Sequence, residues 1–255
     1  MPLASFLESL FKWLFLLALA VAVVTWFYKD KLPEPGFYIN PDLADPRQTP
    51  TTRTPFSTSI NGQTYLITPK FDYEFEAIVV SYHDADAFTD ISHFSSWKDF
   101  INLRDLCVVW GENLRSGVYQ RMKFHNDSWT CWVQWQAQDA SLFRKDQLSN
   151  NHLLSDSPRI QQAILDAEPG DHIRIRGMLV EYANPGNGFK RGTSTTRMDT
   201  GNGACETIYV TDFAILQKAN AGARSLYRFS FWLAVLGLIG FVIFLFIAPP
   251  KNNVT

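Results

Sequence analysis

The sequence predicts a mainly β fold: an OB-like Greek-key barrel with one short helix, flanked by two transmembrane helices. Three observations predict it. Apolar segments lie near both ends of the 255-residue chain, at residues 6–28 and 229–248. Residues 170–182 alternate apolar and polar side chains with the period of a half-buried strand. Between the apolar segments the pattern predicts three strands, a helix and two strands, which is the order of an OB-fold.

The first apolar segment has an uncharged centre at residues 13–24. It reaches the length of a bilayer span, and bulky aromatic residues and Lys29 follow it where a cleaved signal peptide would carry small residues. We interpret it as a membrane anchor that is retained. The second segment, residues 229–248, has Ser230 as its one polar side chain. Two spans place both termini on one side of the membrane and the residues between them on the other.

Small residues occur in both apolar segments: Ala18 and Ala22 in the first, Gly237 and Gly240 in the second. Small side chains allow membrane helices to approach closely. Alanine and glycine are also common in membrane helices without such a role, so both interpretations stay open.

Residues 29–60 are rich in proline and almost without periodicity, which predicts an extended connector. The barrel domain is expected at residues 61–218. Its first strand is the clear alternation at residues 71–79, and its second is the short apolar run at residues 106–110.

The third part of the barrel is expected to be a hairpin, formed by residues 118–124 and 129–135 around an Asn-Asp-Ser turn. A polar crossing follows at residues 137–156. Ser157 as a cap and Pro158 in the first turn then begin a short amphipathic helix. The strand at residues 170–182 follows this helix, and residues 207–216 form the last strand.

Composition narrows the function classes. The net charge of −2 leaves no basic surface for phosphate backbones, so nucleic acid is not an expected partner. Aromatic residues make up 15% of the chain, and core packing in alternating strands explains them without a ligand. The sequence contains no serine-nucleophile motif, no phosphate-binding glycine loop and no paired-cysteine zinc spacing, so we predict neither a cofactor nor a metal.

Three segments carry a resemblance to a known family. They are the Asn-Asn-His-Leu-Leu run at residues 150–154, the strand GDHIRIRGMLVEY and the run STTRMDTGNGACETIYV. The chain resembles a family of uncharacterised bacterial membrane-anchored proteins with an OB-like domain. The resemblance covers most of residues 32–216, while the second span and the insertion around residues 83–104 depart from it. It implies a fold and a membrane location, but no activity.

The polar residues of these motifs are the candidate binding site: Asn151, His152, Arg197, Asp199 and Glu206. Either they are buried groups whose hydrogen bonds tie loops to the barrel, or they contact a ligand or a partner.

Two other polar patterns have simpler explanations. Asp199-Thr200-Gly201 is the tripeptide of aspartic proteases, but Arg197 and Met198 precede it in place of an apolar strand, so a tight turn is favoured. Histidines and aspartates crowd residues 83–93 without the spacing of a calcium loop. We interpret these residues as a solvated loop.

The three cysteines allow a disulfide prediction, which depends both on the strand order and on the cellular compartment of the domain. With the third and fifth barrel strands parallel and adjacent, Cys131 and Cys205 lie near each other, and we predict a disulfide between them if the domain is periplasmic. Cys107 is then a buried free thiol. The alternative is three unpaired, buried cysteines in a reducing compartment.

Two functions from different classes remain. The first is a non-catalytic, membrane-anchored interaction or scaffold subunit of a bacterial envelope complex, with the lipid bilayer and other membrane proteins or a second copy as partners. The alternative is a membrane-bound hydrolase or metal-dependent enzyme that uses Asp199 or the residues 83–93.

The expected location is the bacterial inner membrane, with both termini cytoplasmic and the domain periplasmic. The alternative is a cytoplasmic domain. Basic residues on the domain side of the spans favour that alternative; they are Lys29, Lys31, Lys218, Arg224 and Arg228.

Overall fold

A computed structural model describes residues 3–87, 90, 92–197, 199 and 204–248. The chain divides into two compact units. One contains the two terminal helices, and the other comprises residues 32–219. The fold is mixed, with a large β sheet and two long apolar helices, because the terminal helices add substantial α structure to a β-rich domain.

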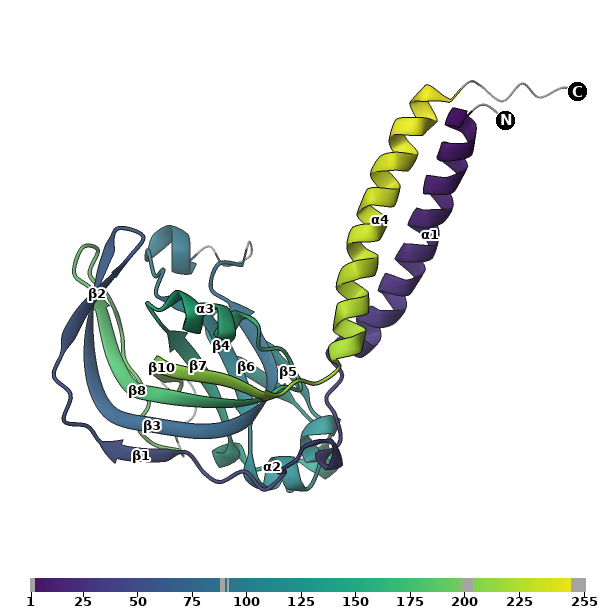
Figure 1. The fold of residues 1–255 in the computed structure, drawn as a ribbon. Helices are drawn as coiled ribbons and strands as arrows, with labels where there is room; N and C mark the ends of the chain where they lie inside the picture. The colour runs from purple at the N-terminus through teal and green to yellow at the C-terminus, as the bar shows by residue number, and fades with distance from the viewer. Residues whose placement is uncertain (1–2, 88–89, 91, 198, 200–203, 249–255) are drawn as a thin grey trace, which may run out of the picture. The chain divides into compact units, whose positions relative to one another are not determined.

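The helical unit consists of α1 (Leu3–Lys29) and α4 (Ala221–Ile247), which pack along each other (Figure 1). Each helix has 27 residues. At about 1.5 Å per residue this is about 40 Å, more than the ~30 Å of a bilayer core. The two helices are therefore long and apolar enough to cross a membrane, as the sequence predicts. Helix α4 begins eight residues before the predicted span at residue 229.

The small residues of the two helices lie where α1 and α4 approach each other, and the two glycines of α4 pack against phenylalanines of α1. A Cβ atom on Gly237 would lie 2.8 Å from the backbone nitrogen of Phe15, and one on Gly240 would lie 2.4 Å from the Phe11 ring. Ala18 and Ala22 are buried. The close-approach interpretation is therefore correct, and the approach takes place inside the chain.

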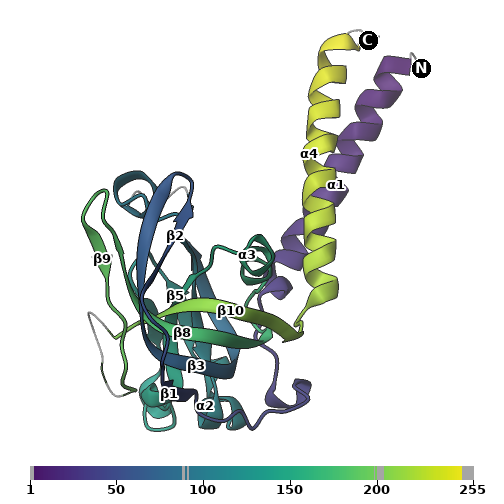
Figure 2. The same cartoon turned by 60° about the vertical axis from the view of Figure 1, so that its left-hand side comes forward.

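Residues 32–219 are built around one eight-stranded sheet in the described part of the chain. Its strands are β1 (Arg47–Pro50), β2 (Phe56–Ile60), β3 (Gln63–Asp84), β4 (Asn102–Val109), β7 (Leu148–Leu154), β8 (His172–Asn184), β9 (Phe189–Arg191) and β10 (Glu206–Gln217). The long strands β3, β8 and β10 lie side by side in Figure 1, and β9 forms a hairpin with β8 in Figure 2.

The pairings connect five of these strands in a cycle. Strand β3 pairs with β4, β4 with β7, β7 with β10, β10 with β8, and β8 again with β3. The pairing of β7 with β10 is parallel and the other four are antiparallel. The apolar faces of these strands enclose the main core, which includes Leu106, Leu153 and Ile208.

A separate two-stranded sheet, β5 (Lys123–Asn126) and β6 (Cys131–Gln134), lies in the region of the predicted hairpin. Residues 118–121, which were predicted to begin its first strand, form a helical turn instead. The prediction that this hairpin supplies the strand beside β10 is wrong. Strand β7, from the segment expected as a polar crossing, occupies that place beside β10. The reason is its composition: Ser149, Asn150, Asn151 and His152 are all buried, and such a polar run lacks the apolar alternation of a strand.

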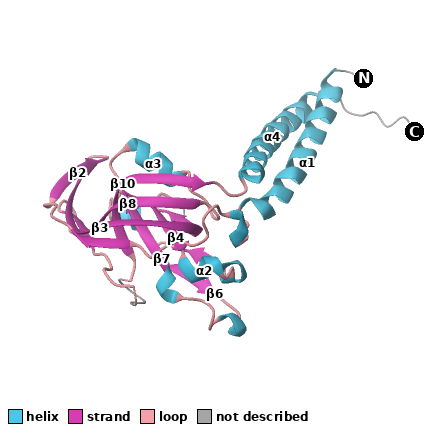
Figure 3. Cartoon of the chain, turned by 60° about the horizontal axis from the view of Figure 1, so that its bottom comes forward, coloured by secondary structure: helices cyan, strands magenta, loops and turns pink. Residues whose placement is uncertain are grey.

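Short helices complete the domain (Figure 3). They are α2 (Gly111–Arg115) and α3 (Pro158–Leu165), with helical turns at Pro35–Phe37, Ser92–Ser96, Val118–Arg121, Ala137–Asp139 and Lys145–Gln147. Helix α3 is the predicted amphipathic helix, and it buries Ile160 and Ile164. Pro158 begins it as expected, but the Ser157 side chain makes no capping hydrogen bond.

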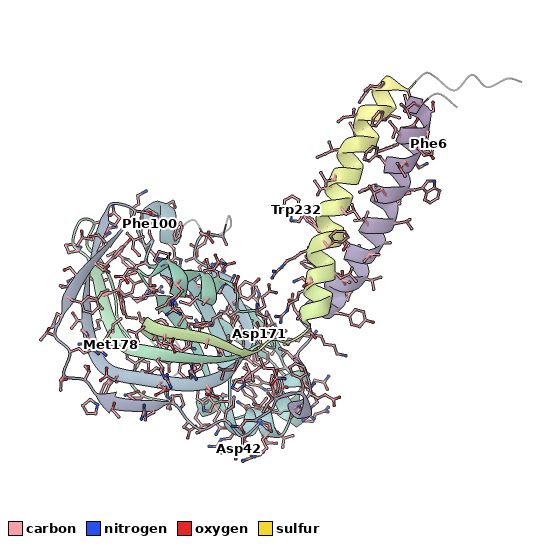
Figure 4. All side chains as sticks on the ribbon, in the orientation of Figure 1. Phe6, Asp42, Phe100, Asp171, Met178 and Trp232 are labelled. Atoms are coloured by element: carbon pink, nitrogen blue, oxygen red, sulfur yellow. A yellow bond between two sulfur atoms is a disulfide. The ribbon has the colours of Figure 1, made fainter. Side chains whose placement is uncertain are left out.

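The strand at residues 170–182 is confirmed, and as β8 it continues to Asn184. Asp171, labelled in Figure 4, fixes its start, because its carboxylate accepts hydrogen bonds from the backbone nitrogens of Glu168 and Ala219. Gly177 permits close contact with β10, since a Cβ atom there would lie 2.2 Å from the Tyr209 carbonyl oxygen.

The connector prediction for residues 29–60 needs a correction. The segment begins with the end of α1, and its later part contributes β1 and β2 to the sheet. Tyr38 and Leu43 are buried in the main core, and the Tyr38 hydroxyl donates to the Gly170 carbonyl at 2.9 Å. We did not predict these strands because we interpreted the prolines as evidence against strands. Edge strands tolerate proline, whereas central strands do not.

Candidate ligand-binding site

Three of the five predicted site residues lie on strands of the sheet, and Arg197 and Asp199 lie in the segment before β10. Asn151 and His152 lie on β7, and Glu206 begins β10. Glu206 pairs with Asn151, while His152 pairs with Thr207. Because successive side chains of a strand point to opposite faces, Asn151 and Glu206 share one face and His152 lies on the other. The structure thus divides the predicted cluster into two parts.

The first part is an ion pair between the partly exposed Arg197 and the buried Glu206. Glu206 is 2% exposed, and its Oε1 accepts a hydrogen bond from Arg197 Nη1 at 2.5 Å. Arg197 also donates to the Tyr73 hydroxyl, and its guanidinium lies 5.2 Å from the Tyr73 ring centre and 5.8 Å from that of Trp110. These contacts hold Arg197 at the end of the sheet where β10 begins.

The carboxyl of Glu206 is only half satisfied. Its Oε2 is buried and has no hydrogen-bond partner within the described part of the chain. Burial raises the pKa of Glu206 to about 7, although Arg197 acts in the opposite direction. Glu206 is therefore a group that exchanges its proton near neutral pH at the start of β10.

The second part is the cross-strand pair of His152 and Asp105, which face each other on β7 and β4. His152 Nδ1 lies 2.6 Å from Asp105 Oδ1, and both side chains are almost fully buried. Burial lowers the pKa of His152 more than Asp105 raises it. Burial favours a higher pKa for Asp105, but His152 and Arg191 hold it below its usual value. A neutral histidine beside a charged carboxylate fits a structural role.

Asn151 also has a structural role. Its Nδ2 donates to the Leu106 carbonyl at 3.1 Å and to Ser149 Oγ at 2.8 Å. These bonds tie β7 to β4 inside the sheet. For Asn151 the interpretation as a buried hydrogen-bonding group fits the contacts, while the buried contact of His152 is its pairing with Asp105.

Asp199 lies near Arg197 and Glu206, because all three line one cavity. Its side chain is exposed, and Oδ2 accepts a hydrogen bond from Ser194 Oγ at 2.6 Å, as in a locally bonded turn. The rest of the Asp-Thr-Gly tripeptide, Thr200 and Gly201, lies outside the described residues.

The acidic and histidine-rich segment organises itself around Asp90. Its Oδ2 lies 2.9 Å from His83 Nε2 and 2.6 Å from His93 Nδ1. The carboxylate thus contacts one ring nitrogen of each histidine. Across the described ranges, no group of three or more histidine, cysteine or acidic side chains is placed to hold a metal ion. Asp90 and His93 are buried, so this part of the insertion is not the solvated loop we expected.

The predicted disulfide between Cys131 and Cys205 is wrong. Cys131 is bonded to Cys107, with their Cα atoms 5.9 Å apart, and Cys205 is free. The cause is the misplaced third strand: β7, and not the Cys131 hairpin, pairs with β10. Cys107 is thus not a free thiol. Burial raises the pKa of the Cys205 thiol to about 11, and Asn150 Nδ2 lies 3.5 Å from its sulfur.

Two cavities lie at this end of the domain. The first, about 240 Å³, is lined by Arg197, Asp199 and Glu206 together with aromatic side chains from the β5–β6 sheet and the segment after it. The second, about 550 Å³, is lined by His152, Arg191 and further aromatic residues, and Cys205 lines both cavities. Four of the five predicted residues therefore border a cavity.

The aromatic walls of these cavities are functional candidates that our sequence reasoning assigned to the core. Trp129 and Trp132 are each 56% exposed, and Trp135 is 39% exposed. A signal was present in the sequence. Trp129 and Trp135 share strand parity, whereas Trp132 has the opposite parity, so one buried face cannot hold all three.

Comparisons with known protein families, with curated proteins and with solved structures find no match for this chain.

Proposed function

We propose that the protein is a non-catalytic, membrane-anchored interaction subunit of a bacterial envelope complex, and that it binds through the two aromatic-lined cavities. One observation carries the proposal: three tryptophans of a single hairpin are 39–56% exposed around two cavities, and the lining of the first includes the Arg197–Glu206 ion pair. Exposed tryptophan is rare on free surfaces and is enriched at the centres of binding interfaces.

We also propose that residues 32–219 form an OB-like Greek-key barrel. The cycle of pairings from β3 through β4, β7, β10 and β8 back to β3 supports it, as does helix α3 between β7 and β8. In OB-folds the loops between strands 1 and 2 and between strands 4 and 5 border the binding face. The corresponding loops here, β3–β4 and β8–β10, contribute Trp97 and Arg197 to the cavities.

The bilayer spans are proposed to anchor this domain and not to recruit its partner. The glycines of α4 already pack against α1, with Gly237 against Phe15 and Gly240 against Phe11. On this proposal the domain contacts the partner, through the surface where the exposed tryptophans lie.

We place the protein in the inner membrane, with both termini cytoplasmic and the domain periplasmic. The Cys107–Cys131 disulfide supports this side, because disulfides persist in oxidising compartments and are rare in the cytosol. The basic residues that flank the spans carry less weight, since long domains are translocated largely regardless of charge.

The native mass of the protein tests the interaction role. We expect full-length protein, extracted from its own membranes in a mild detergent, to elute with a mass well above that of one chain plus its micelle. The double variant Trp132→Ala/Trp135→Ala should elute as a single chain, whereas Ile39→Ala, at a residue 89% exposed, should leave the assembly intact. A parent protein found only as a free single chain would contradict the proposal.

A further inference from the structure

The first cavity contains an acceptor without a partner. Glu206 Oε2 is buried, lacks a hydrogen bond from any described residue, and belongs to a side chain that lines the cavity. Leaving a buried polar group unsatisfied is costly, so a native protein keeps one where something completes it. The cavity thus offers a bonding position to a ligand that carries a hydrogen-bond donor.

The charge of the lining selects against ionic ligands. Lys145 and Arg197 contribute two positive charges, and Asp199 and Glu206 can contribute two negative ones. Arg197 is already paired with Glu206, and Lys145 Nζ lies 5.6 Å from the centre of the Trp135 ring. A phosphate or a nucleic acid strand would find no net positive charge here, and a cationic ligand would find Arg197 beside the free carboxylate oxygen.

The apolar lining consists of flat aromatic faces. The rings of Trp135 and Phe143 are stacked, 6.1 Å apart with an angle of 24°. Trp132 Nε1 donates to Asp127 Oδ2 at 2.6 Å, which fixes the indole although it is 56% exposed. A rigid, half-exposed ring is already ordered for contact, so binding to it loses little side-chain entropy.

A sugar ring combines the features that these groups require. Its C–H faces are apolar and stack on aromatic rings, and its hydroxyl groups donate and accept hydrogen bonds without charge. Hydroxyls also suit both protonation states of Glu206, whose pKa is raised by burial to about 7. The volume of about 240 Å³ is below the roughly 300–1,000 Å³ of drug-sized sites, which fits one ring.

Resting on the proposed binding function, we propose that the first cavity binds one ring of a neutral oligosaccharide, stacked on Trp132 or Trp135 with a hydroxyl bonded to Glu206 Oε2. The second cavity shares Cys205 with the first and carries Trp97, Trp129 and Phe189, so further rings of the chain have an adjoining aromatic surface. This assigns the envelope complex a glycan-containing component as the ligand of this subunit.

The test uses full-length protein in a detergent without a sugar headgroup, titrated separately with chitotetraose, cellotetraose and maltotetraose. Tryptophan fluorescence and calorimetry report binding. We expect at least one of the three to bind, and Trp132→Ala and Glu206→Leu each to weaken it by about tenfold or more. Ile39→Ala serves as the matched control and should bind as the parent does.

Three outcomes overturn the inference: none of the three sugars binds, the two cavity variants bind as the parent does, or acetylcholine or inorganic phosphate binds in their place. Unchanged thermal unfolding of Trp132→Ala shows that its loss of binding is not a loss of fold. The native mass separates this inference from the interaction role. An intact assembly without sugar binding contradicts the inference alone, and a single chain that binds sugar contradicts the assembly alone.

Discussion

The double variant Cys107→Ala/Cys131→Ala is expected to unfold roughly 10 °C below the parent protein. The disulfide joins the fully buried Cys107 of β4 to the β5–β6 sheet across 24 residues of chain. Chain-entropy estimates for a loop of this length give about 3 kcal/mol, and each kcal/mol shifts the melting temperature of a domain of this size by about 2–4 °C. Thermal unfolding of full-length protein, followed by near-ultraviolet circular dichroism, measures the change.

Cys205→Ser is the control for this prediction, because Cys205 makes no disulfide and its replacement should leave the melting temperature nearly unchanged. Alkylation under denaturing conditions without reductant should modify one cysteine, and after reduction it should modify three. Three reactive thiols before reduction, or equal melting temperatures for the parent and the double variant, would refute the pairing of Cys107 with Cys131.

The stability that Glu206 contributes is expected to fall as the pH rises from 5 to 8. Its pKa is raised to about 7 in the folded protein from about 4.5 in the unfolded chain, so the folded state binds more protons between these values. The contribution is fully present below pH 4.5 and is lost as the pH passes 7. Glu206→Gln removes this titration. The parent should therefore lose on the order of 2 kcal/mol relative to this variant between pH 5 and 8.

Burial also raises the pKa of Asp99 to about 6 and lowers the pKa values of His93 and His152. These groups titrate in both proteins, so comparing the melting temperatures of the two proteins at each pH isolates Glu206. Glu74→Gln is the matched control. Arg176 lowers the pKa of Glu74, which is more exposed than Glu206, so its titration falls below this range. A difference between parent and Glu206→Gln that stays constant from pH 5 to 8 would show that Glu206 is ionised throughout.

Sequence patterns predicted the elements whose burial is regular. Long uninterrupted apolar segments identify α1 and α4, and clean alternation identifies β3 and β8. Strand β7 was not predicted, because four consecutive polar residues occupy its buried positions. Their burial is stabilised by tertiary hydrogen bonds such as that from Asn151 to Leu106, which no local pattern reveals.

The same strand explains the error in the cysteine pairing. The prediction put the Cys131 hairpin where β7 lies, and so placed Cys131 beside Cys205. In the structure the hairpin packs against β4, and Cys131 is bonded to Cys107. When one strand is assigned to the wrong place in a sheet, the contacts predicted between it and its neighbours are wrong as well.

The sequence predicted which residues belong to the candidate site, but not how they are arranged in the fold. The motif residues do include an ion pair, Arg197 with Glu206, and four of the five border a cavity. Their division between two faces follows from the register of β7 with β10, which sequence alone does not determine. The exposure of Trp132 likewise depends on where the hairpin packs.

The central claim is that the tryptophan-lined cavities are the contact surface of this protein. Its most direct test replaces Lys145, an exposed residue that lines the first cavity, by a photoreactive amino acid in full-length protein in living cells, and in a separate strain replaces Ile39. Both tryptophans of the first cavity are kept. We expect irradiation to give a discrete adduct of higher mass from position 145, carrying a partner protein or a glycan, and none from position 39. No adduct from position 145, or the same adducts from both positions, would contradict the claim.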